Sequence, residues 1–305
     1  MTLFVSSEQQ KNANFSHAYF IAGEHVYSQQ PIALLEEFKV DFQQLENVVD
    51  ISDSNLVENS FDIDLSTLIF QGEGSFSGGM KQVAVWERNG IQLLRIGEHN
   101  FSLTNLVTNH VQLLNQYQSD QLESAEILLG PPLLTLLAKQ SIFCLHAGAI
   151  ATEHGTVVFI GESGRGKSTL SQSTATRSWS RLGDDIMPVC LDDENVLIIP
   201  RFPQLKRKQQ YLDEVKKPLI AIFRLMESTG NKQIECKLIQ GSEALITLSR
   251  HTAASLVFNG TLLAENMIFN QKVLSRTPVY NLSYPRDMDY LDNVRHAVNK
   301  VLQGI

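Results

Sequence analysis

The chain has 305 residues, of which 43% are hydrophobic and 19% are charged, a balance typical of a globular protein with a full hydrophobic core. Its 33 acidic and 25 basic residues give a formal net charge of −8. This charge argues against a general nucleic-acid binder or a membrane-surface binder, because such proteins present a basic face.

No apolar run approaches the roughly 18 residues of a membrane-spanning helix, and the first residues lack the basic and apolar regions of a signal peptide. The three cysteines, Cys144, Cys190 and Cys236, are widely spaced and match neither a disulfide framework nor a zinc motif. They are therefore predicted to be buried thiols of a cytoplasmic protein. We expect no nucleic-acid or membrane partner, and assembly into a homo-oligomer stays open.

Residues 1–120 are rich in short segments in which apolar and polar residues alternate, as in half-buried strands. Asn89-Gly90 lies between two of them and is typical of a two-residue hairpin turn. A short helix is expected around residues 31–38. We predict a β-rich N-terminal domain that serves as a platform for a substrate or partner, with strands at Val48–Ile51, Phe61–Leu65, Val83–Glu87 and Ile91–Ile96.

Residues 121–305 alternate strand and helix patterns, which favours an α/β nucleotide-binding domain and an α+β chain overall. A helix is expected over residues 122–139, interrupted near Gly130-Pro131-Pro132. Further helices are expected after residue 168, from 241 to 256 and from 288 to 302. Apolar runs predict strands at Ile142–His146, Thr156–Ile160, Ile186–Cys190, Val196–Ile199 and Leu219–Phe223.

The segment after the strand at 156–160 matches the phosphate-binding pattern G-x-x-x-x-G-K-[ST]. Its residues are Gly161, Glu162, Ser163, Gly164, Arg165, Gly166, Lys167 and Ser168, followed by Thr169. A strand, a glycine loop and a helix in this order let backbone N–H groups and the helix N-terminus face phosphate oxygens. Lys167 is expected to reach the β- and γ-phosphates of ATP, and the Ser168 hydroxyl to bind Mg²⁺.

Two adjacent carboxylates, Asp184 and Asp185, follow after the distance that one helix and a returning strand require. Successive side chains of an extended segment point to opposite sides, so one carboxylate can face an acceptor hydroxyl and the other Mg²⁺. A solvated turn is the alternative. His146, at the end of a predicted strand, is either a hydrogen-bonded core residue or a charge partner near these carboxylates.

The densest basic run, residues 201–208, includes Arg201, Lys206 and Arg207. Most such runs are solvated surface, but this one can also guide an acidic substrate or hold a phosphate group. Arg250 and Arg286 are further candidates for phosphate contact.

Taken together, these motifs resemble the HPr serine kinase family, whose kinase domain shares a fold with phosphoenolpyruvate carboxykinase. The matching residues run in family order: Leu145-His146-Ala147-Gly148-Ala149, the loop at 161–168, and Gly183-Asp184-Asp185. The segments 199–205 and 282–287 resemble shorter relatives that act in bacterial peptide modification, including lasso-peptide tailoring kinases. The similarity covers residues 122 to 300.

The resemblance implies that Asp184 is the general base for a serine hydroxyl and that Asp185 holds Mg²⁺ with Ser168. It also implies that Lys167 neutralises the phosphates and that His146 supports the two carboxylates. The glycine-rich segment linked to phosphorylase activity in HPr kinases is not found after the Asp pair, so HPr itself is not expected as the substrate.

The sequence therefore predicts an Mg²⁺- and ATP-dependent kinase whose acceptor is a hydroxyl, most simply a serine of a peptide or protein. A small-molecule hydroxyl is a close alternative, and a catalytically inactive ATP-binding regulatory or assembly module is another. A motor or transporter ATPase is disfavoured, because the apolar strand at 219–223 is followed by Arg224 and not by an acid.

Overall fold

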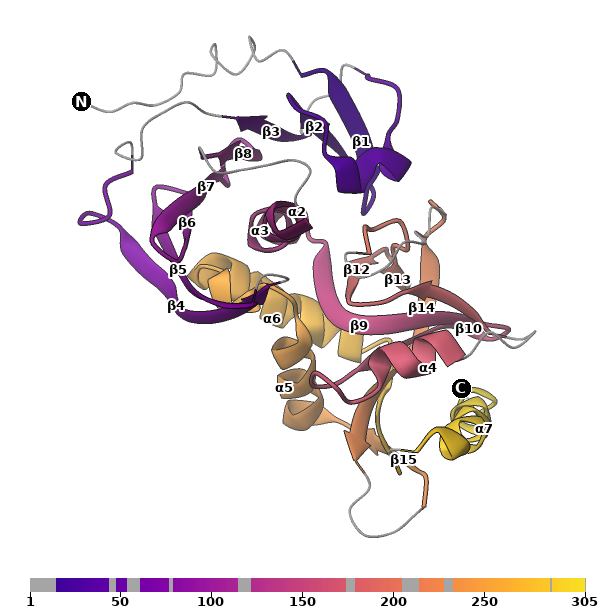
Figure 1. The fold of residues 1–305 in the computed structure, drawn as a ribbon. Helices are drawn as coiled ribbons and strands as arrows, with labels where there is room; N and C mark the ends of the chain where they lie inside the picture. The colour runs from indigo at the N-terminus through magenta and orange to yellow at the C-terminus, as the bar shows by residue number, and fades with distance from the viewer. Residues whose placement is uncertain are drawn as a thin grey trace. The chain divides into compact units, whose positions relative to one another are not determined.

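The structure is a computed structural model, and it describes residues 15–43, 48–53, 61–76, 79–114, 122–173, 179–204, 214–227, 233–285 and 287–304. The chain divides into two compact units (Figure 1). The first comprises residues 1–140 with 256–260, and the second comprises residues 141–255 with 261–305. The expected domain boundary at residue 120 stays a prediction. In the structure the two helices that follow residue 120, Leu122–Leu129 and Pro131–Lys139, lie within the first unit.

The first unit contains an eight-stranded sheet and three short helices within its described residues. The strand order is β1-β2-β3-β8-β7-β6-β5-β4, and neighbouring strands are antiparallel except for the parallel pairs β2–β3 and β3–β8. The elements are β1 (His17–Ile21), β2 (Glu24–Ser28), η1 (Ala33–Phe38), β3 (Val49–Asp53), β4 (Thr67–Phe76), β5 (Gly79–Arg88), β6 (Ile91–Ile96), β7 (His99–Asn105), β8 (His110–Leu113), α2 (Leu122–Leu129) and α3 (Pro131–Lys139).

Most local predictions for this unit are confirmed. The hairpin at Asn89-Gly90 joins β5 to β6, and both residues have positive φ angles, 52° and 75°, as the tightest hairpin turn requires. The predicted strand at 61–65 is wrong. Those residues form turns, in which the Leu65 amide donates to the Asp62 carboxylate at 3.3 Å, because an Asp side chain offers the backbone a partner that competes with sheet pairing.

The second unit is built on a mixed sheet with strand order β10-β9-β12-β13-β14-β16-β15. β11 also pairs with β9, and β10 pairs in parallel with β14. The elements are β9 (Phe143–Thr152), β10 (Gly155–Ile160), α4 (Lys167–Ser173), β11 (Ser180–Gly183), β12 (Ile186–Leu191), β13 (Val196–Ile198), β14 (Lys217–Glu227), β15 (Glu235–Ile239), α5 (Gly241–His251), α6 (Gly260–Leu274), β16 (Val279–Tyr284), η4 (Met288–Tyr290) and α7 (Leu291–Leu302). The short η3 (Ser255–Val257) and the first residue of α6 fall where the two units meet in sequence.

The core of the second unit forms around the apolar runs Val157–Ile160 of β10 and Leu219–Phe223 of β14. Phe159 and Phe223 are fully buried, with ring centroids 6.0 Å apart, and each contributes about 2–3 kcal/mol by burial. Val294 and Val298 of α7 belong to the same cluster. This packing fixes the ends of β10 and β14, and the loop after β10 is the phosphate-binding motif.

These observations establish a mixed α/β protein with two large sheets. The predicted helix at 241–256 ends earlier, at His251, and the predicted helix at 288–302 begins as the short η4 before α7. Within the described part of the chain no helix is both long and apolar enough to cross a membrane. The cysteines are free, and Cys144 and Cys190 are buried whereas Cys236 is half-buried.

Candidate functional site

The loop between β10 and α4 is shaped by glycines. Gly166 has a φ of +92°, and a Cβ at this position would lie 2.6 Å from the hydroxyl oxygen of Tyr284. That hydroxyl donates a hydrogen bond to the Arg165 carbonyl at 3.0 Å. β16 therefore fixes the loop through the Tyr284 hydroxyl. Only glycine fits at position 166 without displacing the loop or Tyr284.

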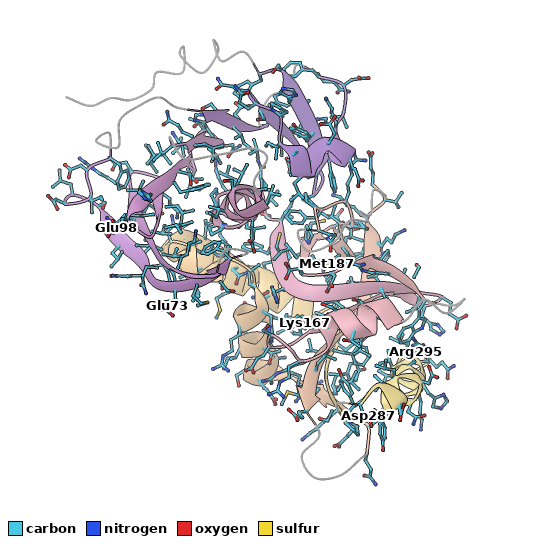
Figure 2. All side chains as sticks on the ribbon, viewed as in Figure 1. Glu73, Glu98, Lys167, Met187, Asp287 and Arg295 are labelled. Carbon is cyan, nitrogen blue, oxygen red and sulfur yellow. The ribbon has the colours of Figure 1, made fainter. Side chains whose placement is uncertain are left out.

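Lys167, labelled in Figure 2, is the first residue of α4 and is 7% exposed. Its ammonium group donates to the carbonyl of Gly161 at 2.6 Å and to the carbonyl of Glu162 at 3.1 Å. The charge is thus held across the start of the loop. A phosphate oxygen can take one of these hydrogen bonds, which a charged acceptor would make stronger.

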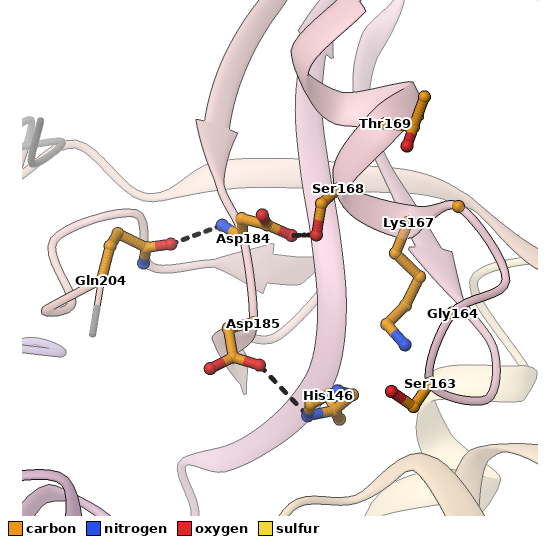
Figure 3. Close-up of a pocket in the computed structure, with 10 residues that line it drawn as sticks. His146, Ser163, Gly164, Lys167, Ser168, Thr169, Asp184, Asp185 and Gln204 are labelled. Carbon is orange, nitrogen blue, oxygen red and sulfur yellow. Dashed lines mark hydrogen bonds and ion pairs between the residues drawn. The ribbon is translucent and has the colours of Figure 1, made fainter. Parts of the chain in front are cut away.

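Ser168 and Asp184 face one another in the same site (Figure 3), where the serine hydroxyl donates to Asp184 Oδ1 at 3.0 Å. The backbone N–H of Asp184 donates to the side-chain oxygen of Gln204 at 2.5 Å, and the Gln204 amide donates to the Phe202 carbonyl at 3.1 Å. Gln204 is 2% exposed. This buried amide therefore fixes the backbone that carries the carboxylate pair.

Asp185 lies beside His146, with 3.6 Å between Asp185 Oδ1 and His146 Nδ1 (Figure 3). The two residues meet because β12 pairs with β9 in a register that places Ile186 opposite His146. The Asp185 carbonyl accepts from the Ala147 amide at 3.0 Å, and Asp185 has a positive φ of 80°. A non-glycine residue in this region of φ is uncommon, and here it turns the two carboxylates in different directions.

A cavity of about 360 Å³ joins these groups. Nine of the residues that the sequence singled out line it, together with Gln204: His146, Ser163, Gly164, Gly166, Lys167, Ser168, Thr169, Asp184 and Asp185. Gln204 was not predicted as a site residue. Two signals pointed to it: a polar residue enclosed in the apolar segment at 202–205, and its place in the segment 199–205 that carries part of the family resemblance.

The remaining candidates lie elsewhere. Gly161, Glu162, Arg165 and Arg250 line a second cleft. Arg201 is 8% exposed and pairs with Glu214 at 2.7 Å, and it does not line either of these two spaces. The candidates Lys206, Arg207 and Arg286 lie outside the described residues.

The first cavity offers few ligands for a metal ion. Within the described ranges no three His, Cys, Asp or Glu side chains cluster closely enough to hold one by themselves. Mg²⁺ characteristically takes one or two carboxylates and completes its shell with water and substrate phosphates. The hydroxyl of Ser168 and the carboxylate of Asp184, 3.0 Å apart, fit that smaller requirement.

The hydrogen bond from Ser168 goes to Asp184, and the His146 contact goes to Asp185. The resemblance implied the other pairing, in which Asp185 shares Mg²⁺ with Ser168. Which carboxylate serves the metal and which takes a proton stays a prediction, and the geometry bears on it directly.

No protein-family model matches the chain, and no curated protein is similar to it at a significant level. Among solved structures, it is similar to the Hpr(Ser) kinase/phosphatase from Coxiella burnetii, with 12% sequence identity and a TM-score of 0.28. The similarity covers 52% of this chain and 97% of that chain. A similarity this weak carries no argument about function, which has to be inferred from the site itself.

Proposed function

We propose that the second unit is a phosphotransferase that uses Mg²⁺ and ATP and transfers the γ-phosphoryl group to a hydroxyl. One observation carries the proposal: a single cavity contains Lys167, the hydrogen-bonded pair Ser168–Asp184, and a second carboxylate, Asp185, beside His146. A site that only binds ATP has no use for the second carboxylate.

The loop and Lys167 would bind the triphosphate. The loop residues Ser163, Gly164 and Gly166 and the first residues of α4 line the cavity. Their backbone N–H groups would bind phosphate oxygens without reorganising during the reaction. Lys167 would stabilise the charge that develops on the oxygen between the β- and γ-phosphorus atoms. Ser168 and Asp184 would hold Mg²⁺, which when bound supplies positive charge to the β- and γ-phosphate oxygens.

Asp185 is the better candidate for the proton acceptor. Both carboxylates line the cavity, but Asp184 is 7% exposed and hydrogen-bonded to Ser168, whereas the Asp185 side chain is 20% exposed. In the proposed step the acceptor oxygen bonds to the γ-phosphorus, the bond from that phosphorus to the bridging oxygen breaks, and ADP leaves. The hydroxyl proton passes to Asp185, which His146 keeps oriented.

This assignment exchanges the roles that the resemblance implied for the two carboxylates. The acceptor remains a serine of a peptide or protein, with a small-molecule hydroxyl as the alternative, since no described contact selects between them.

The experiment compares the wild type with Asp184→Asn, Asp185→Asn and the control Asp193→Asn. Asp193 is exposed in the turn between β12 and β13 and does not line the cavity. Each protein is incubated with Mg-ATP and candidate acceptors, and the products are followed by mass spectrometry. We expect a gain of one phosphoryl group that is lost in Asp185→Asn while ATP affinity is kept. If the wild type binds Mg-ATP and phosphorylates nothing, water included, the chain is a binding module and the proposal fails.

A further inference from the structure

A second cleft of about 790 Å³ lies beside the phosphate-binding loop in the same unit. It is formed by the end of β14, the end of α5 and the start of the loop. Three basic side chains that play no part in the proposed chemistry line it, Arg224, Arg250 and His251.

Two carboxylates, Glu162 and Glu227, also line the cleft, so its charge depends on how the basic groups pair. Arg165, also in its wall, is 2.5 Å from Glu227 and 3.8 Å from Glu162, so both of these carboxylates lie against Arg165. Among the residues that the structure describes, the ion-pair partner of Arg224 is Glu243, at the long distance of 3.9 Å.

Arg250 is exposed, and it forms no ion pair with any residue in the described part of the chain. Arg250, and Arg224 with its long contact to Glu243, are thus the guanidinium groups of the cleft that do not pair with Glu162 or Glu227. Guanidinium groups match carboxylate and phosphate oxygens geometrically.

Burial and the basic groups around the cleft affect the pKa of His251. Burial, followed by the charges of Lys167, Arg224 and His146, lowers its pKa to about 4, against a small opposing influence of Glu162. The imidazole is therefore neutral at pH 7, and an anion bound next to it would raise its pKa. The neutral ring can still donate one N–H to an anionic oxygen.

The position of the cleft relative to the loop indicates which substrate it serves. The ammonium group of Lys167, which marks the β- and γ-phosphate end of such a loop, is held by the carbonyls of Gly161 and Glu162. Those two residues line the second cleft, whereas Thr169 lies in the first cavity. The second cleft therefore opens beside the γ-phosphate end, where an acceptor has to approach.

We propose that the cleft lined by Arg224, Arg250 and His251 binds a carboxylate or phosphate group on the hydroxyl-bearing acceptor. The proposal rests on the proposed function and extends it: the acceptor is an anionic molecule, or a peptide with an acidic group close to the phosphorylated residue. The cleft selects it by charge and holds its hydroxyl next to the γ-phosphorus.

The test uses the full chain saturated with Mg²⁺ and a non-hydrolysable β,γ-imido analogue of ATP, so that the phosphate loop is filled. Inorganic phosphate and succinate are titrated separately, by calorimetry and by NMR of the His251 ring. We expect at least one probe to bind and to raise the pKa of His251. Arg250→Gln and Arg224→Gln should each weaken binding about tenfold or more, as expected for loss of a hydrogen bond to a charged group.

The control is Lys300→Gln, which removes an exposed cation of α7 outside both spaces and should leave binding unchanged. The tighter probe identifies whether the acceptor carries phosphate or carboxylate. The proposal is overturned if neither probe binds, if Arg250→Gln binds as well as the wild type, or if the analogue displaces the probes, which would make the cleft part of the nucleotide site. Failure of the analogue to bind would refute the proposed function instead, and the Arg250→Gln comparison on the free protein would still decide on the cleft.

Discussion

Substitution of Gly166 by alanine should damage both stability and nucleotide binding. At a φ of +92° an L-residue is strained by about 1–2 kcal/mol. The added Cβ would also lie 2.6 Å from the Tyr284 hydroxyl oxygen, and overpacking of this kind costs about 1–3 kcal/mol. Gly166→Ala should therefore lower the free energy of unfolding by about 2–5 kcal/mol. Because the loop has to move, the Kd for ATP should rise about tenfold or more, which corresponds to about 1.4 kcal/mol.

Chemical denaturation and calorimetric titration of ATP measure these two effects. Gly241→Ala is the matched control, because Gly241 has a φ of +59° and nothing within 4 Å of an added Cβ, so it should show the backbone strain alone. In Gly166→Ala/Tyr284→Phe the nearest remaining ring atom, Cζ, would be 3.9 Å away, and the overlap should disappear. The reasoning is refuted if Gly166→Ala lowers the free energy of unfolding no more than Gly241→Ala does. It is also refuted if removal of the Tyr284 hydroxyl restores neither stability nor ATP affinity.

Three further predictions concern the two carboxylates of the site, the Gln204 amide and Asp50 of the first unit. Asp184→Asn should raise the Mg²⁺ concentration needed for half-maximal turnover, whereas Asp185→Asn should lower kcat by about 10²–10⁴-fold with little change in ATP affinity; equal Mg²⁺ dependence in both variants would contradict the division of roles. Gln204→Met keeps the side-chain length but removes the acceptor for the Asp184 amide, so it should lower the free energy of unfolding by about 1–3 kcal/mol and also lower kcat; a change in stability without any change in kcat would limit Gln204 to a structural role. Burial raises the pKa of Asp50 from 3.8 to about 6, so the folded state binds the proton more tightly and stability falls as pH rises across that interval. The stability advantage of Asp50→Asn over the wild type should accordingly grow between pH 4 and pH 6 and stay constant above it, and denaturation at several pH values would contradict this if the advantage were flat throughout.

Local signals predicted the elements that carry the phosphate loop. β10 is a continuous apolar run, and the glycine pattern after it leaves few other conformations. Other elements lack such signals. β4 contains Gly72 and Gly74, which weaken a strand pattern, yet in the structure the rings of Phe70 and Phe76 lie over these glycines and replace the missing side chains.

Helix α6 was not predicted because its apolar residues do not follow one face. Leu262 and Phe269 are buried, but Leu263, Met267 and Ile268 are exposed, so no 3.6-residue period stands out.

The composition of the site was predictable, but its pairings were not. Spacing alone placed Asp184 and Asp185 near the loop. The choice of partner for each depends on the register of β12 against β9, which sets Ile186 opposite His146, and on the amide of Gln204. Both are tertiary features with no local sequence signature.

The central claim is that one cavity both binds Mg-ATP and transfers its γ-phosphoryl group. The most direct test is phosphorus NMR of the wild-type chain with Mg-ATP, in water alone and with anionic hydroxyl acceptors, beside Asp185→Asn. The account predicts that the wild type moves the γ-phosphoryl group, slowly to water and faster to an anionic acceptor, and that Asp185→Asn binds ATP but leaves it intact. Tight binding of Mg-ATP by both proteins with no loss of the γ-phosphate signal in either would contradict it.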